Sequence, residues 1–128
     1  MEYITGSFLV TATGLRTITG LPFEPKGLRI MAGKKSGQTE NGQARFSLGF
    51  TDGENTFVDS HLGNANGFWT RDSDNYDEDY TVVLLSYPSG GPVNRFFSGE
   101  FIEFTEDGFS IDFDQVDASA RVYFEAFG

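Results

Sequence analysis

Residues 101–113 read FIEFTEDGFSIDF, two arms in which apolar and polar residues alternate on either side of Glu106-Asp107-Gly108. Successive side chains of a β-strand point to opposite faces, so Phe109, Ile111 and Phe113 fall on one face, and the Ser and Asp residues between them fall on the other. A short connection containing Gly joins antiparallel arms of this kind. The segment predicts a β-hairpin with a three-residue connection and one buried face.

The same period of two continues on both sides of this hairpin. Three alternating sets are predicted to share one core: Phe46, Leu48 and Phe50; Phe109, Ile111 and Phe113; Val122, Phe124 and Ala126. The continuous apolar run Tyr80–Tyr87 is expected to form the central strand. The aromatic C-terminal strand, residues 120–127, is expected to leave an edge that a partner must cover.

Turn-forming residues divide the chain into short pieces. The sequence has 16 Gly and 4 Pro, and 14 Phe with 5 Tyr supply much of the core material. Gly20–Pro25, Gly33–Gln43 and most of Asp59–Asp79 are expected to be loops, and Asp52-Gly53 a turn. With no sustained helical period, the chain is predicted to be one all-β domain, residues 1–128, folded as an antiparallel β-sandwich of about eight short strands.

The net charge and the absence of Cys exclude or disfavour several classes of function. Nine Lys and Arg face 19 Asp and Glu, a formal net charge of −10, which disfavours nucleic acid and anionic membranes as partners. Without Cys there is no disulfide, thiol catalysis or Cys-ligated zinc. The start of the chain shows no signal peptide, and the apolar run Val82–Leu85 is too short to span a bilayer.

The single histidine, His61, follows Ser60 and Asp59. A serine nucleophile needs a histidine within hydrogen-bond reach, but neighbours on an extended chain point in opposite directions, and no nucleophile-elbow motif is present. His61 is therefore expected to be a solvated loop residue. Nothing singles out a pair of carboxylates as acid and base, and no phosphate-binding loop occurs. We expect no enzymatic activity, no catalytic residue and no cofactor.

The acidic segment Asp72–Asp79 suggests a calcium loop, since Ca²⁺ prefers clustered oxygen ligands. The segment does not match the spacing of an EF-hand loop, because positions six and twelve counted from Asp72 hold Asp77 and Val83 instead of Gly and Glu. A looser calcium site and a solvated, self-repelling loop remain open, and no metal requirement for folding is expected.

Trp69 lies close in sequence to Phe68 and Tyr76. An aromatic ring beside Asp and Asn side chains is the chemistry that binds sugars, because the ring contacts C–H groups while the polar groups bind hydroxyls. A core Trp is the alternative interpretation.

Five short sequence segments, taken in their order along the chain, resemble segments of bacteriophage virion domains. They are Gly6-Ser7-Phe8, Gly20–Lys26, Ala44–Phe50, Asp107–Phe113 and Tyr123–Gly128. That group is in turn similar to H-type lectins, small antiparallel sandwiches that form trimers and bind sugars at loop ends. No residue here matches their sugar site.

The resemblance implies a non-catalytic structural protein located in the virion: a capsid decoration, head-fibre or tail-fibre component. Its expected partners are other virion proteins and its own copies in a homotrimer. The alternative is a carbohydrate-binding, lectin-like module that recognises a glycan on a host surface.

Overall fold

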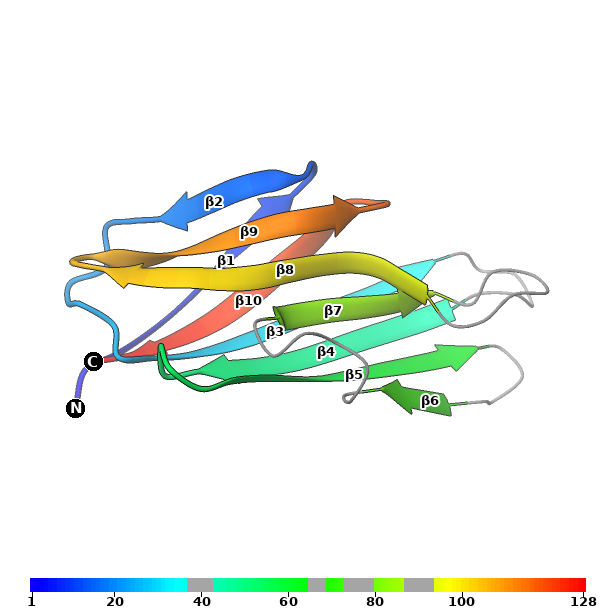
Figure 1. Cartoon of the computed structure of the whole chain (residues 1–128), viewed down its shortest axis with the longest axis horizontal. Helices are drawn as coiled ribbons and strands as arrows, with labels where there is room; N and C mark the ends of the chain where they lie inside the picture. Colours follow the sequence, from blue (N-terminus) through cyan, green and yellow to red (C-terminus); the bar gives the residue numbers. More distant parts are fainter. Residues whose placement is uncertain (37–42, 65–68, 73–79, 87–93) are drawn as a thin grey trace.

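The computed structural model describes residues 1–36, 43–64, 69–72, 80–86 and 94–128, and for residues 35, 36, 43, 64 and 69–72 the backbone alone. Within these ranges lie ten strands and no helix, arranged as two antiparallel sheets packed face to face (Figure 1). The strands are β1 Tyr3–Val10, β2 Gly14–Ile18, β3 Gly27–Ser36, β4 Gln43–Thr51, β5 Thr56–Asn64, β6 Trp69–Asp72, β7 Tyr80–Ser86, β8 Asn94–Thr105, β9 Gly108–Val116 and β10 Ala120–Phe127. The predicted all-β, antiparallel sandwich is confirmed, with ten strands in place of about eight.

The six-stranded sheet has the order β1-β10-β3-β4-β5-β6, and the four-stranded sheet has the order β2-β9-β8-β7. The C-terminal strand β10 pairs with β1 on one side and β3 on the other. The expectation that it leaves an open edge is therefore wrong, because the N-terminal strand covers that edge. The two ends of the chain meet (Figure 1), where the amide of Gly128 donates to the carbonyl of Glu2 at 3.0 Å.

The hairpin predicted for residues 101–113 is formed by β8 and β9. Thr105 pairs with Gly108, so the connection consists of the two residues Glu106 and Asp107 instead of the three predicted. Phe109, Ile111 and Phe113 are fully buried, as their alternation predicts.

The main core lies between β1, β10 and β3 of one sheet and β9, β8 and β7 of the other. Phe8, Phe109 and Phe124 pack ring against ring, with centroids 5.0–6.4 Å apart. Val122, Phe124 and Ala126 are buried as predicted. Pairs of aromatic rings in this geometry add to the free energy gained from their burial.

The third alternating set, on β4, faces the opposite way from the prediction. Phe46 is 44% exposed and Leu48 and Phe50 are half-buried, whereas Arg45, Ser47, Gly49 and Thr51 are buried. The reason is a close approach of backbones. A Cβ atom at Gly49 would lie 1.7 Å from the carbonyl oxygen of Thr81 on β7, so this face of β4 accepts only a residue without a side chain there.

β7 is not the central strand that its apolar run predicted, because it pairs with β8 alone in the four-stranded sheet. It is nevertheless buried from Thr81 to Leu85. Val82 and Leu84 enter the main core, while Val83 and Leu85 form a second cluster with residues of β5. Burial on both faces explains the continuous apolar run.

The other edge of β7 is hydrogen-bonded by side chains of the opposite sheet. The amide of Val83 donates to Ser47 Oγ at 3.0 Å, and Ser60 Oγ donates to the carbonyl of Val83 at 2.7 Å. Arg45 Nε donates to the carbonyl of Leu85 at 2.6 Å. These bonds satisfy buried backbone groups that would otherwise cost about 1–3 kcal/mol each.

Two expected loops are partly strand. Gly33–Ser36 continues β3, and Gln43 begins β4, because the β3–β4 ladder extends to the pair Ser36 and Gln43. Within Asp59–Asp79, residues up to Asn64 belong to β5, and Trp69–Asp72 form β6. The parts of these expected loops at residues 37–42, 65–68 and 73–79 lie outside the described residues, as does Tyr87 at the end of the expected central strand. The Asp52-Gly53 turn is confirmed, with Gly53 at a φ of 95°.

Replacing Phe113 by Ala should reduce the free energy of unfolding by about 3–5 kcal/mol, because a buried ring is lost and a cavity remains. Phe57→Ala, at a ring that is 55% exposed, should change it by less than about 1 kcal/mol. Urea unfolding of both variants measures the difference. Equal effects would contradict the assignment of inner and outer faces.

Gly49→Ala should destabilise the protein by about 3 kcal/mol or more, because the new methyl group forces β4 away from the backbone of β7. Gly27→Ala is the matched control in the same sheet, since a Cβ there meets its nearest atom at an ordinary 3.8 Å. Thermal unfolding compares the two variants, and a neutral effect of Gly49→Ala would show that the backbones do not meet as described.

Candidate functional site

The outward alternation of β4 exposes an apolar surface on the six-stranded sheet. We call this surface the outer apolar face. It comprises side chains from β10, β3, β4 and β5: Tyr123, Met31, Phe46, Leu48, Phe50 and Phe57. Tyr123 and Phe57 are about half exposed, at 50% and 55%.

The strand register makes this face continuous. Tyr123 pairs with Met31, and Met31 pairs with Leu48. Phe50 lies two residues along β4 from Leu48 and stacks on Phe57, with ring centroids 5.8 Å apart. Directly opposite residues on one face of a sheet are in contact, so the apolar side chains form one patch across four strands. Contiguous apolar surface of this kind marks sites of protein association.

Charged side chains also lie within this face, where Arg29 is directly opposite Phe50 and Asp59 directly opposite Leu48. Arg29 donates to Glu125 at 2.9 Å, and His61 Nε2 lies 3.4 Å from Asp59. Arg121 donates to Ser7 Oγ at 3.2 Å. The Arg29–Glu125 pair is thus neutralised within the face, and a partner that covers the face buries these two charges together.

The outer face of the four-stranded sheet has the opposite character. Glu100 stands directly across from Asp112, and Glu103 lies beyond them on the same face. Its exposed apolar residues, Leu15 and Ile102, lie on non-neighbouring strands. The sandwich is therefore two-sided, with one apolar outer face and one acidic outer face.

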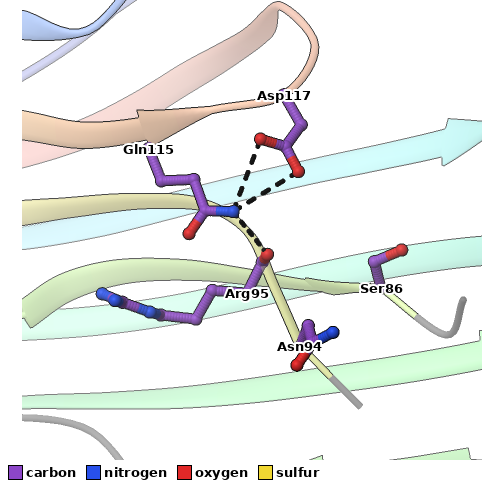
Figure 2. Close-up of a pocket in the computed structure, with 5 residues that line it drawn as sticks. All are labelled: Ser86, Asn94, Arg95, Gln115 and Asp117. Carbon is purple, nitrogen blue, oxygen red and sulfur yellow. Dashed lines mark hydrogen bonds between the residues drawn. The ribbon is translucent and has the colours of Figure 1, made fainter. Parts of the chain in front are cut away.

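A polar depression of about 440 Å³ opens where β7 ends, β8 begins and β9 ends (Figure 2). It is lined by Ser86, Asn94, Arg95, Gln115 and Asp117. Gln115 Nε2 donates to the carbonyl of Arg95 at 2.7 Å and lies 3.4 Å from both carboxylate oxygens of Asp117. The amide of Asp117 donates to the carbonyl of Phe96 at 3.0 Å, which ties this wall of the depression to β8.

Beside the depression, Asp114 is the centre of a hydrogen-bond network. It accepts hydrogen bonds from Ser98 Oγ and from the Tyr80 hydroxyl, and Arg95 Nη1 lies 3.4 Å away. Burial opposes ionisation of Asp114, but these bonds and the Arg95 charge outweigh it and lower the pKa of Asp114. Burial, with the hydrogen bond to Asp114, raises the pKa of Tyr80.

Ser60 and His61 do not meet. Ser60 is buried and donates to Val83, whereas His61 lies on the outer face with its ring 6.4 Å from that of Phe46. His61 belongs to strand β5 and not to a loop, so that expectation is wrong; the β4–β5 ladder extends through it. The opposed directions follow the alternation of a strand, and no Ser–His nucleophile forms at this position.

The remaining candidates fall mostly beyond what the structure describes. Asp72 ends β6 and pairs with Ser60, and Trp69 begins β6 opposite Gly63. Phe68 and residues 73–79, Tyr76 among them, lie outside the described residues, as do the side chains of Trp69 and Asp72. Elsewhere in the described chain, no three His, Cys, Asp or Glu side chains gather as a metal site would require.

Comparison with known proteins gives no relative: no protein family, curated protein or solved structure matches the chain. The described residues also contain no helix with the length and apolar character needed to cross a membrane. The surfaces of the molecule are therefore the basis on which its function is inferred.

In the variant Asp114→Asn, the free energy of unfolding should fall less than in the parent protein as the pH is lowered from neutral to acidic values. A carboxylate whose pKa is lowered by folding contributes stability above its unfolded pKa, near 4, and loses it as the pH falls through the folded value. At neutral pH the loss should be at most about 1 kcal/mol, because the side chain is 37% exposed and solvent screens its charge. Urea unfolding between pH 7 and pH 3 measures this.

The matched control is Glu106→Gln, at an exposed carboxylate in the β8–β9 connection. Its stability profile should run parallel to that of the parent protein. If Asp114→Asn and the parent differ equally at all pH values, the network does not hold Asp114 in its charged form.

Proposed function

We propose that this chain is a non-catalytic structural protein of a bacteriophage particle, a capsid decoration, head-fibre or tail-fibre component that attaches to other particle proteins. The observation that carries the proposal is the outer apolar face. Burying the exposed rings of Phe46, Phe57 and Tyr123 would stabilise an attachment by roughly 25 cal/mol per Å² of apolar area removed from water. Aromatic anchors of this kind dominate the energetics of protein interfaces.

The two-sided character of the sandwich supports the same proposal. A protein bound to a particle needs one face that docks and one face that remains in water. The outer apolar face suits docking, since it presents exposed aromatic rings and its Arg29 is paired with Glu125. The acidic face, with Glu100 opposite Asp112, suits exposure to solvent and keeps crowded copies apart.

A homotrimer is the assembly we propose, on the resemblance to virion domains described above. In a closed three-fold ring each interface joins two different patches of neighbouring subunits, and the outer apolar face can supply one of these patches or dock on the particle. The alternative function is a lectin-like module, and the polar depression at the ends of β7, β8 and β9 is the observation that favours it.

The parent protein should form a stable oligomer by light scattering and co-purify with intact particles. The double variant Phe46→Ser with Phe57→Ser should weaken this association by at least about tenfold, because two anchors are lost. Both rings are substantially exposed, so the fold should survive, which circular dichroism verifies.

Leu15→Ser with Ile102→Ser is the control, because these residues are exposed by 63% and 48% on the acidic face instead. This variant should assemble like the parent. A parent protein that is strictly monomeric, absent from particles and bound to a defined sugar would replace the structural proposal by the lectin.

A further inference from the structure

We infer that the polar depression between the ends of β7, β8 and β9 binds a neutral, hydroxyl-rich ligand, the chemistry of a saccharide. The site lies at the end of the four-stranded sheet, away from the residues of the outer apolar face. Its residues are independent of those in the proposed attachment surface, so each proposal can fail alone.

Part of the depression is fixed in place. Gln115 is held between the carbonyl of Arg95 and the carboxylate of Asp117, as Figure 2 shows. The Arg95 guanidinium turns away from the depression (Figure 2), with its Cζ 4.9 Å from the centre of the Tyr80 ring. Walls that are already hydrogen-bonded lose little conformational entropy when a ligand binds.

Other groups of the depression are available to a ligand. Among the described residues, no hydrogen bond engages the Asn94 side-chain amide or the Ser86 hydroxyl, and the Asp117 carboxylate has only long contacts with Gln115. The Asn94 amide both donates and accepts, the Ser86 hydroxyl does the same, and Asp117 accepts only. Two adjacent hydroxyl groups of a ligand match these donors and acceptors, because each hydroxyl can donate one hydrogen bond and accept others.

The electrostatics select against charged ligands. Arg95 is offset by Asp114 at 3.4 Å, so its charge is not free for a carboxylate or sulfate. Asp117 at the rim and the net charge of −10 repel anions further. A metal ion would find one carboxylate among the lining residues, fewer than hard cations usually recruit.

Size and polarity agree with this assignment. A volume of about 440 Å³ falls within the range of small-molecule sites and accommodates roughly one or two sugar rings. All five lining residues are polar or charged, and most of the surface they present is polar, which suits hydroxyl groups better than an apolar ligand. Binding through a shallow polar site should be weak, with a millimolar dissociation constant.

The test is a titration of the full chain with methyl glycosides of neutral hexoses and, separately, with sialic and glucuronic acid glycosides, followed by NMR. We expect at least one neutral glycoside to shift the side-chain amide signals of Asn94 and Gln115 saturably at millimolar concentration. The acidic glycosides should cause no such shift.

Asn94→Ala should weaken that binding by about tenfold, the effect of one lost hydrogen bond, and Asp117→Asn should weaken it as well. Glu106→Gln, in the connection at the far end of β8 and β9, is the matched control and should bind like the parent. No saturable shift with any neutral glycoside, binding only of acidic glycosides, or binding that survives Asn94→Ala unchanged would each overturn the inference.

Discussion

The free edge of β7 is satisfied from the opposite sheet, and much of this sandwich depends on that contact. Ser47 and Ser60 hydrogen-bond the backbone of Val83, and Arg45 bonds that of Leu85. The bonds require β4 to lie against β7, which only Gly49 permits. Once β4 turns this polar side inward, its apolar side must face outward, and the outer apolar face results. The same contact thus closes the core and creates the candidate interface.

The parts of the fold that were predictable are those in which one face of a strand is uniformly apolar and the other polar. Residues 109–113 satisfy this condition, and in residues 120–127 the uniformly apolar face is the buried one although Tyr123 and Phe127 lie on the other face, so the buried faces of both segments follow from alternation. β4 alternates just as cleanly, yet its polar side is buried, because hydrogen bonds between sheets outweigh the usual preference. The sequence feature that indicates this arrangement is the set of small residues Ser47, Gly49 and Ser60, since small side chains allow two backbones to approach each other. Their spatial proximity is invisible in a linear sequence.

The candidate surfaces were less predictable than the fold. The outer apolar face draws on β10, β3, β4 and β5, and its continuity is set by strand register over pairs as distant as Met31 and Tyr123. The depression gathers Ser86, Asn94 and Gln115 from the ends of three strands, and no local motif marks them. Alternation along the chain did indicate correctly that Ser60 and His61 diverge, because that inference needs only neighbours in one strand.

The contrast between the two outer faces has a consequence for ionic strength. Added salt screens the repulsion between copies that each carry a net charge of −10, and strongly hydrated anions such as sulfate also strengthen the burial of apolar surface. Both effects act in the same direction, so the proposed association through the outer apolar face would tighten as salt rises. A nucleic-acid-binding protein behaves in the opposite way. In the proposed association, ionic strength would therefore set the strength of the contact with no change in the shape of the sandwich.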